Sequence, residues 1–241
     1  MNRRPRGGPG QFDARLARAE HVLAAGGSAA APLTALVTVL DHQRRRAAAP
    51  EVVAAVDCVV AAAAERRRAS RFPQLDTDES EAAVAVELGL AVSEISGGLP
   101  VVLQTTGDEL MSISSDERAE RISVWLDDPS LVAAPAGFWF RVAAGPLFEL
   151  AAAAVGPPAP GTWHGSSCPL CGGPAQVSVI AEESGEFMGG SPRSLVCTRC
   201  ASWWSFPRAV CALCGQDDPR SITGFLAPAN RVVRVDCCET C

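Results

Sequence analysis

Four short cysteine pairs in the last third of the chain decide the fold: CPLC at 168–171, CTRC at 197–200, CALC at 211–214 and CETC at 238–241. They contain eight of the ten cysteines in this 241-residue chain. A C-x-x-C turn places two sulfur atoms on the same side of a tight knuckle, and two knuckles supply four ligands for one tetrahedral metal ion. The ladder therefore predicts two metal sites of four cysteines each.

The order of the knuckles indicates how they combine. Glycine follows the first knuckle of each half, at Gly172 and Gly215, and is missing from the second knuckle of each half. This repetition favours pairing in sequence order, although crossed pairing also satisfies the spacing. The first site then uses Cys168, Cys171, Cys197 and Cys200, and the second uses Cys211, Cys214, Cys238 and Cys241.

The chemistry of four thiolates limits what these sites do. Tetrahedral sulfur accepts either iron or zinc, so we expect two metal ions without choosing between these elements. Because all four ligands come from the protein, neither site keeps an open position for a substrate, which argues against hydrolysis at the metal. We predict no catalytic residues and no organic cofactor.

Two other uses of the cysteines are less consistent with the sequence. A thioredoxin-type dithiol opens a helix within a βαβ unit, and no such unit surrounds these pairs. Structural disulfides are typical of exported proteins, but no apolar leader region follows the arginines at positions 3 and 4. We therefore expect a cytoplasmic protein with no membrane insertion. We also expect Cys58 to be a packed core thiol and Cys237 not to be a ligand, since the spacing selects Cys238.

The remaining sequence predicts a multi-domain α+β protein. Apolar residues recur with helical spacing from position 12 to 25, 32 to 48, 50 onward, 79 to 96, 115 onward and 136 to 154, with a weaker region at 101–112. Short β-like runs, QVSVI, RSLV, SITGF and RVVRV, then accompany the cysteine pairs. We predict a disordered N-terminus at 1–10, an all-α helical domain at 11–155, a proline-rich linker at 156–161, and two small β-rich metal modules at 162–209 and 210–241.

The charge balance disfavours a nucleic-acid partner. The formal net charge is −6, and acidic residues outnumber arginines both before and after residue 160. A nucleic-acid-binding zinc ribbon normally carries a basic surface, so this class is the weaker alternative.

The cysteine-rich segment resembles the formate dehydrogenase accessory protein family, FdhE, over about 75 residues. The resemblance lies in C-P-x-C-G-x-P at Cys168–Pro174, in Arg193 and Leu195 before Cys197, and in Trp204 and Arg208 after Cys200. It departs at Trp203 and Val210, where the family tends to carry an acid and a lysine. The family usually continues beyond the position of Cys241, so we expect either a weaker second site, with a ligand at the chain end, or a truncated copy of the sequence.

The resemblance implies a helical N-terminal region joined to two rubredoxin-like or zinc-ribbon modules. It also implies a non-enzymatic maturation protein, or chaperone, of the cytoplasm that binds the catalytic subunit of a formate dehydrogenase. The main alternative is a rubredoxin-like electron-transfer protein, in which iron sites with four sulfur ligands alternate between ferric and ferrous states.

Overall fold

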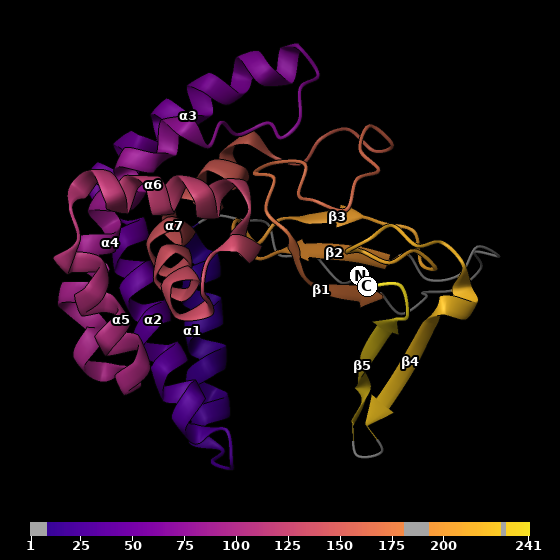
Figure 1. Ribbon diagram of the computed structural model, residues 1–241, viewed down its shortest axis with the longest axis horizontal. Coiled ribbons are helices and arrows are strands. Elements are labelled where there is room, and N and C mark those ends of the chain that lie inside the picture. Colours follow the sequence, from indigo (N-terminus) through magenta and orange to yellow (C-terminus); the bar gives the residue numbers. More distant parts are fainter. Residues whose placement is uncertain (1–8, 181–192, 228–229) are drawn as a thin grey trace.

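The computed structural model describes residues 9–180, 193–227 and 230–241, which form a body of helices followed by two small antiparallel sheets (Figure 1). The α-helices are α1 (Pro9–Ala24), α2 (Ala30–Ala47), α3 (Pro50–Arg68), α4 (Glu81–Ile95), α5 (Val101–Ser112), α6 (Ser115–Asp127) and α7 (Ala134–Val155). The strands are β1 (Ala175–Ile180), β2 (Arg193–Cys197), β3 (Trp203–Ser205), β4 (Ile222–Ala227) and β5 (Asn230–Cys238). The fold class predicted from the sequence is confirmed.

Local sequence signals set the ends of several helices. Gly26 and Gly27 follow α1 with φ angles of 74° and 116°, a region that glycine adopts without strain. Pro50 begins α3, where its missing N–H is not needed. The Ser114 side chain accepts a hydrogen bond from the Glu117 N–H and caps α6.

Helix α7 lies at the centre of the helical body. Its aromatic residues Trp139, Phe140 and Phe148 are fully buried, and Pro146 lies inside the helix. In the part of the chain that the structure describes, α7 is the one single helix that is long enough and apolar enough to cross a membrane. Helices α2 and α3 pass the same test only when they are taken together, as a pair bent by 73°. Two thirds of the apolar window of α7 is buried, as in the core helix of a folded domain.

Two elements differ from what periodicity predicts. The weak region at 101–112 forms the complete helix α5, although Gly107 in its interior lowers helix propensity. A Cβ atom at Gly107 would lie 3.2 Å from the Trp139 ring, so the glycine lets α5 approach α7 closely. Strand β3 was not predicted, because three residues are too few to show an alternating pattern.

The two sheets have different surroundings. The first has strand order β1–β2–β3, and its Leu195 and Trp204, with Phe206 directly after β3, belong to the same buried core as the helices. The backbone N–H groups of Gln74 and Leu75 donate to the carbonyls of Pro169 and Leu170, at 3.0 and 2.7 Å.

The second sheet pairs β4 with β5 and projects away from the helical body (Figure 1). After Phe206, residues 207–226 and 233–241 are all half-buried or exposed. The predicted domain boundaries stay predictions, and residues 1–8 of the N-terminus predicted to be disordered lie outside the described residues.

Candidate metal centres

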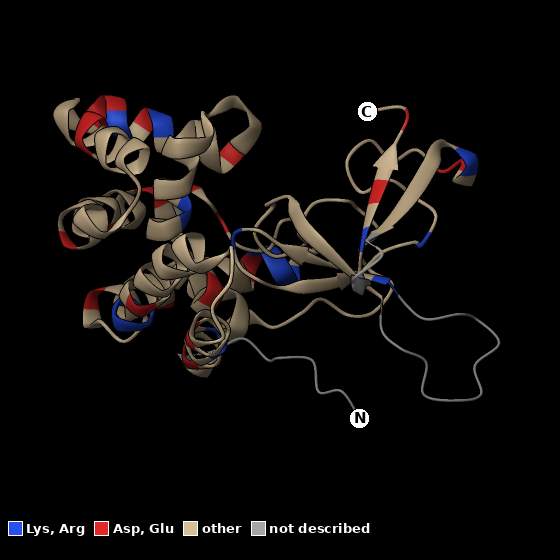
Figure 2. Cartoon of the chain, turned by 90° about the horizontal axis from the view of Figure 1, so that it is seen from below, with Lys and Arg blue, Asp and Glu red and all other residues tan. Residues whose placement is uncertain are grey.

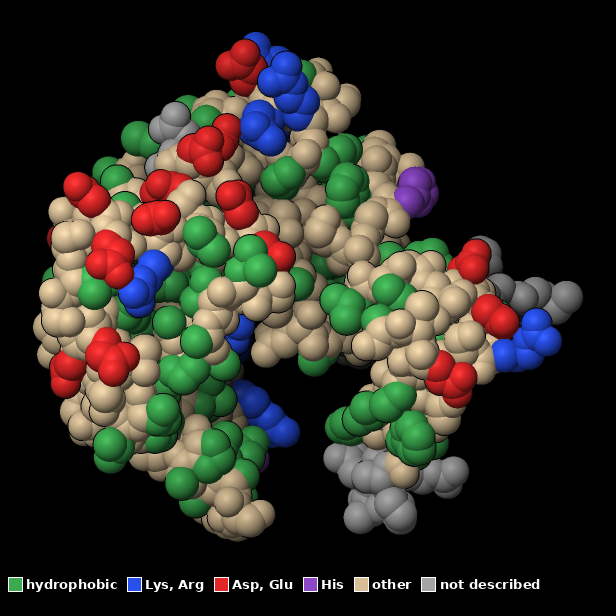
Figure 3. Space-filling model, viewed as in Figure 1, with side chains coloured by type: hydrophobic (Ala, Val, Ile, Leu, Met, Phe, Trp, Pro, Cys, Tyr) green, Lys and Arg blue, Asp and Glu red, His purple; other side chains and the backbone are tan. Residues whose placement is uncertain are grey.

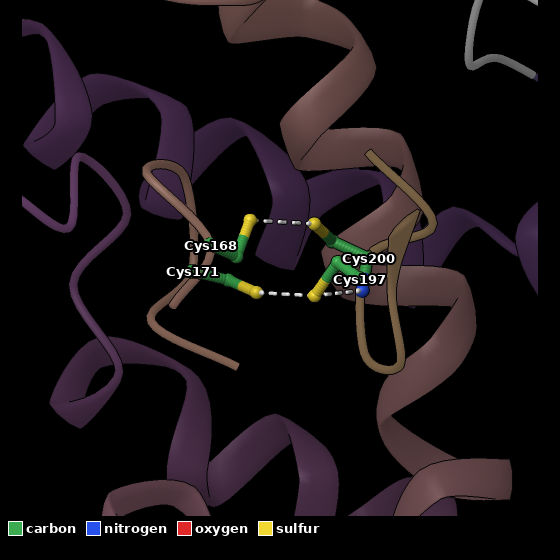
Figure 4. A group of neighbouring side chains, drawn as sticks. All are labelled: Cys168, Cys171, Cys197 and Cys200. Carbon is green, nitrogen blue, oxygen red and sulfur yellow. Dashed lines mark hydrogen bonds between the residues drawn. The ribbon is translucent and has the colours of Figure 1, made fainter. Parts of the chain in front are cut away.

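The first candidate centre joins two knuckles that are far apart in the sequence. The loop before β1 carries Cys168 and Cys171, Cys197 is the last residue of β2, and Cys200 lies in the turn that follows. Their side chains point toward one another, as Figure 4 shows, with Sγ–Sγ distances of 3.5 Å from Cys168 to Cys200 and 3.4 Å from Cys171 to Cys197. All four sulfur atoms lie within 4.8 Å of one another.

The second candidate centre repeats this arrangement at the base of the β4–β5 hairpin. Sγ–Sγ distances are 3.7 Å from Cys211 to Cys241 and 3.7 Å from Cys214 to Cys238. The four sulfur atoms again lie within 4.8 Å of one another. The knuckles thus come together in sequence order and not crossed.

These distances fit a metal ion better than disulfides. A tetrahedron with metal–sulfur bonds of about 2.3 Å has sulfur–sulfur edges of about 3.8 Å. A disulfide would need about 2.05 Å, and all ten cysteines are free thiols. Both clusters can therefore hold one metal ion each. That the eight cysteines are ligands in the protein stays a prediction, and the geometry suits zinc and iron equally.

The CPLC and CALC knuckles are each closed by a backbone hydrogen bond from the residue that follows the second cysteine. The N–H of Gly172 donates to the Cys168 carbonyl at 2.9 Å, and that of Gly215 donates to the Cys211 carbonyl at 3.1 Å. Their φ angles are 73° and 77°. In the CTRC knuckle the corresponding residue is Ala201, which adopts a φ of 54° despite its Cβ atom. The knuckle therefore needs this conformation even where the sequence supplies no glycine.

Electrostatics at the first centre favour a bound cation. Burial raises the pKa of Cys168 and Cys200 well above the ordinary value. Burial acts the same way on Cys171, but hydrogen bonds from the other three thiols and the Arg199 charge outweigh it, so the pKa of Cys171 falls well below the ordinary value. Burial thus works against ionisation of these thiols when no cation is bound. A divalent or trivalent cation would allow all four to ionise.

Arg199, between the two cysteines of the CTRC knuckle, fixes the first centre to the helices. The residue is 2% exposed, and its guanidinium group donates to the carbonyls of Cys171 at 2.8 Å and Leu126 at 2.8 Å. The same group lies over the rings of Trp125 and Phe148, 4.9 and 5.5 Å from their centroids. The sequence signalled only that a positive charge lies near the sulfurs, and the contacts with α6 and α7 could not be predicted from spacing.

The second centre has a different environment. Cys214 and Cys241 are exposed, and Cys211 and Cys238 are half-buried. Hydrogen bonds from the backbone N–H groups of Thr240 and Cys241 lower the pKa of Cys238 to about 6. Hydrogen bonds to Cys214 and Cys211 raise the pKa of Cys241 to about 12. Because these cysteines are exposed or half-buried, solvent reaches the second centre directly.

The two remaining cysteines lie outside both clusters. Cys237 is exposed and does not join the second cluster. The expectation that Cys58 is a packed core thiol is wrong, because its side chain is exposed on α3. Its neighbours Val56 and Val59 take the buried face of that helix, and the uniformly apolar sequence VDCVV did not show which side faced the core.

Comparison with known proteins gives one consistent relationship. No protein-family model matches the chain. A protein FdhE homolog from Shewanella baltica (strain OS185) is 37% identical over 76 residues, which is 32% of this chain and 24% of that protein. The protein FdhE homolog from Shewanella sp. (strain MR-4) is 35% identical over 74 residues, or 31% and 23% of the two chains. The matched region thus spans about a quarter of these relatives.

The structural likeness extends over almost the whole chain. The crystal structure of the FdhE protein from Pseudomonas aeruginosa superposes with a TM-score of 0.68 at 17% sequence identity. It covers 98% of this chain and 82% of that protein. The resemblance to the FdhE family is therefore confirmed, by sequence over 76 residues and by fold over the helices and both small sheets.

Proposed function

We propose that this chain, with the fold of FdhE and two clusters of four cysteines, is an accessory protein needed to form active formate dehydrogenase. In this proposal it resides in the cytoplasm, binds the catalytic subunit of that enzyme and carries two metal ions. The observation that carries the proposal is the pair of four-cysteine clusters set on an FdhE fold that extends over 98% of the chain.

The composition of the centres supports a role other than catalysis. Each cluster offers four protein sulfurs, which complete a tetrahedral ion and leave no position for formate or water. Zinc or iron held in this way supplies structure or, for iron, one-electron exchange, and it does not supply a reactive open site. We therefore propose that the protein acts by binding and is not an enzyme.

The surface charges support a protein partner over a nucleic acid. The formal net charge is −6, and Figure 2 shows both acidic and basic residues on the helices. The second module exposes large apolar side chains, including Leu213, Phe225 and Val235. Figure 3 shows hydrophobic side chains gathered on the hairpin of this module. Exposed apolar patches of this kind mark protein contacts.

Affinity capture from the organism that encodes the chain tests the proposal. Tagged full-length protein should retain the catalytic subunit of formate dehydrogenase, identified by mass spectrometry. Deleting the gene should abolish formate dehydrogenase activity while the subunit polypeptides are still made. Full enzyme activity in the deletion strain would rule the proposal out.

The electron-transfer alternative has a different signature. It requires iron in at least one centre, and visible absorption that dithionite bleaches. Metal analysis of the protein as isolated distinguishes the two functions, because a colourless protein with two zinc ions per chain cannot carry electrons.

A further inference from the structure

The two four-cysteine clusters have the same ligands but opposite surroundings. The sulfur ligands of the first are buried, none more than 3% exposed, whereas those of the second are exposed or half-buried. Since metal release requires a ligand or chelator to reach the ion, this contrast predicts different exchange behaviour at the two centres.

The first centre is part of the helical core. Leu170, between Cys168 and Cys171, is 2% exposed, and its carbonyl accepts the Leu75 N–H. Arg199 connects the opposite knuckle to the carbonyls of Trp125 and Leu126 at the end of α6. Opening this centre therefore breaks contacts made by helices, so its ion can leave only when part of the core unfolds.

The second centre meets that core only at its edge, where Val210 and Ala212 are half-buried against it. Its knuckle residue Leu213 is 78% exposed, and the hairpin that carries Cys238 has Phe225 and Val235 as an uncovered cross-strand pair. Figure 3 shows this module standing clear of the helical body across an open concavity. Ligand exchange at the exposed sulfurs of Cys214 and Cys241 therefore breaks contacts within the hairpin module and leaves the buried core residues in place.

We infer that the two centres divide their roles. The first is a permanent structural centre that fastens the first sheet to the helices. The second is an exchangeable centre that releases its ion to a thiolate or chelating ligand of another molecule while the chain stays folded.

The exchange step is a substitution at the metal without electron transfer. The incoming ligand loses its proton and bonds to the metal, and one cysteine sulfur leaves and takes up a proton. Repetition at the remaining sulfurs transfers the ion. The charge of the ion does not change, so no oxidant or reductant is needed.

The positions of the tryptophans make the two centres separately observable. The chain has five tryptophans, Trp125, Trp139, Trp163, Trp203 and Trp204, and none follows residue 204. Trp125 lies against Arg199, and the Trp204 indole N–H donates to the Gly165 carbonyl three residues before Cys168. Tryptophan emission therefore reports on the first centre and the helices, and not on the second module.

Metal release from the full chain loaded with two Zn²⁺ ions tests the inference. The chromogenic chelator 4-(2-pyridylazo)resorcinol is added in excess, and its absorbance and tryptophan emission are followed together. We expect one equivalent of zinc in a fast phase without change in emission. The second equivalent should follow at least about tenfold more slowly, together with the emission change, because it waits for core opening.

Variants assign each phase to a centre. Cys214→Ala should remove the fast phase and leave the slow phase and the emission unchanged. Arg199→Met should accelerate the slow phase several-fold without affecting the fast one, and Arg199→Lys, which keeps the charge and one donor group, should restore part of the difference. Arg220→Met is the matched control, since Arg220 is 92% exposed in the second module.

Several results would overturn the inference. These are release of both ions in one phase, an emission change during the fast phase, or a fast phase that survives in Cys214→Ala. If Arg199→Met does not fold, the wild-type phases and Cys214→Ala decide the question. None of these measurements involves formate dehydrogenase, so the inference stands or falls separately from the proposed function.

Discussion

At the scale of single residues, the CTRC knuckle contains a conformation that its sequence does not favour. Ala201 has a φ of 54°, where the other two knuckles with a following residue use Gly172 and Gly215. The left-handed region costs an alanine roughly 1 kcal/mol, whereas glycine enters it freely. Ala201 tolerates this because its knuckle is held by the Cys197 N–H bonded to the Ser202 carbonyl at 2.9 Å.

Ala201→Gly should therefore stabilise the first module. We expect a gain of about 0.5–1 kcal/mol in the free energy of unfolding, reduced from the full strain because glycine also gains freedom in the unfolded chain. Gly172→Ala should lose about 1 kcal/mol by the same reasoning in reverse. Denaturant unfolding followed by tryptophan emission measures both, and a loss of stability in Ala201→Gly would show that the positive φ carries no strain.

Residue types and spacing made the four cysteine pairs predictable, but not the groups that support them. The C-x-x-C spacing is a local rule, so each pair follows from the sequence. The repeated glycine favoured combining the pairs in sequence order, and the structure shows this combination and not the crossed one that the spacing also allowed. Arg199 has no such rule, because its carbonyl acceptors at Trp125 and Leu126 lie more than 70 residues away. The exposure of Cys58 was not predictable for the same reason, because it depends on which side of α3 meets the core.

At the scale of elements, an ion pair fastens the first helix to the central one. Arg15 on α1 bonds to both carboxylate oxygens of Glu149 on α7, at 3.0 and 2.7 Å, and Gln11 donates to the same carboxylate. The Glu149 side chain is 6% exposed and that of Arg15 is 37% exposed. Burial raises the pKa of Glu149 above 4.5, while Arg15 and Gln11 act to lower it. The carboxylate thus depends on Arg15 to remain charged.

Arg15→Met should destabilise the protein in a pH-dependent way. We expect a loss of about 2 kcal/mol near pH 7, below the roughly 3–5 kcal/mol for fully buried pairs because solvent screens Arg15. Without Arg15 the folded-state pKa of Glu149 rises further above its unfolded value near 4.5. In the variant, the stability that protonated Glu149 allows below pH 4.5 is then lost as the pH rises through the folded-state pKa of Glu149. The loss relative to wild type should therefore shrink toward pH 4.5.

Thermal and denaturant unfolding between pH 4.5 and 8 measure this effect. Adding Glu149→Gln to Arg15→Met should abolish the pH dependence of the difference. Arg18→Met, an exposed change on the same helix, is the control and should stay within about 0.5 kcal/mol of wild type. A loss in Arg15→Met that is equal at all pH values would mean that packing, not charge, holds α1.

Helices were more predictable than strands for a physical reason. A helix of 12 to 22 residues shows its buried face several times, so α1, α2, α3, α4, α6 and α7 follow from periodicity. Helix α5 was predicted only weakly, because Gly107 and the polar run QTT interrupt its apolar face. The glycine that weakens the helical pattern is needed for packing, since its missing side chain leaves space for the Trp139 ring.

At the scale of the whole molecule, the packing is continuous where the sequence predicts a linker. Helix α7 ends at Val155, and the predicted linker at 156–161 follows it. Yet the buried core continues from Phe148 on α7 to Leu195 in the first sheet and to Leu170 and Phe206 in the segments that flank the sheet. Composition reveals where a chain lacks helix, but not whether the segments on either side share a core. The change from buried to exposed residues falls instead after Phe206.

Two shortened chains would test whether residues 156–161 separate independent domains. A chain ending at residue 209 keeps the first centre, with Leu170 and Arg199 in place, and should bind one metal ion with nearly unchanged tryptophan unfolding. A chain ending at 161 exposes the helical surface that Leu170 covers. Losing that burial alone should cost about 2 kcal/mol, a large fraction of ordinary domain stability. If the shorter chain instead unfolds at the same denaturant concentration as the longer one, the helices are an independent domain and the shared core adds nothing to their stability.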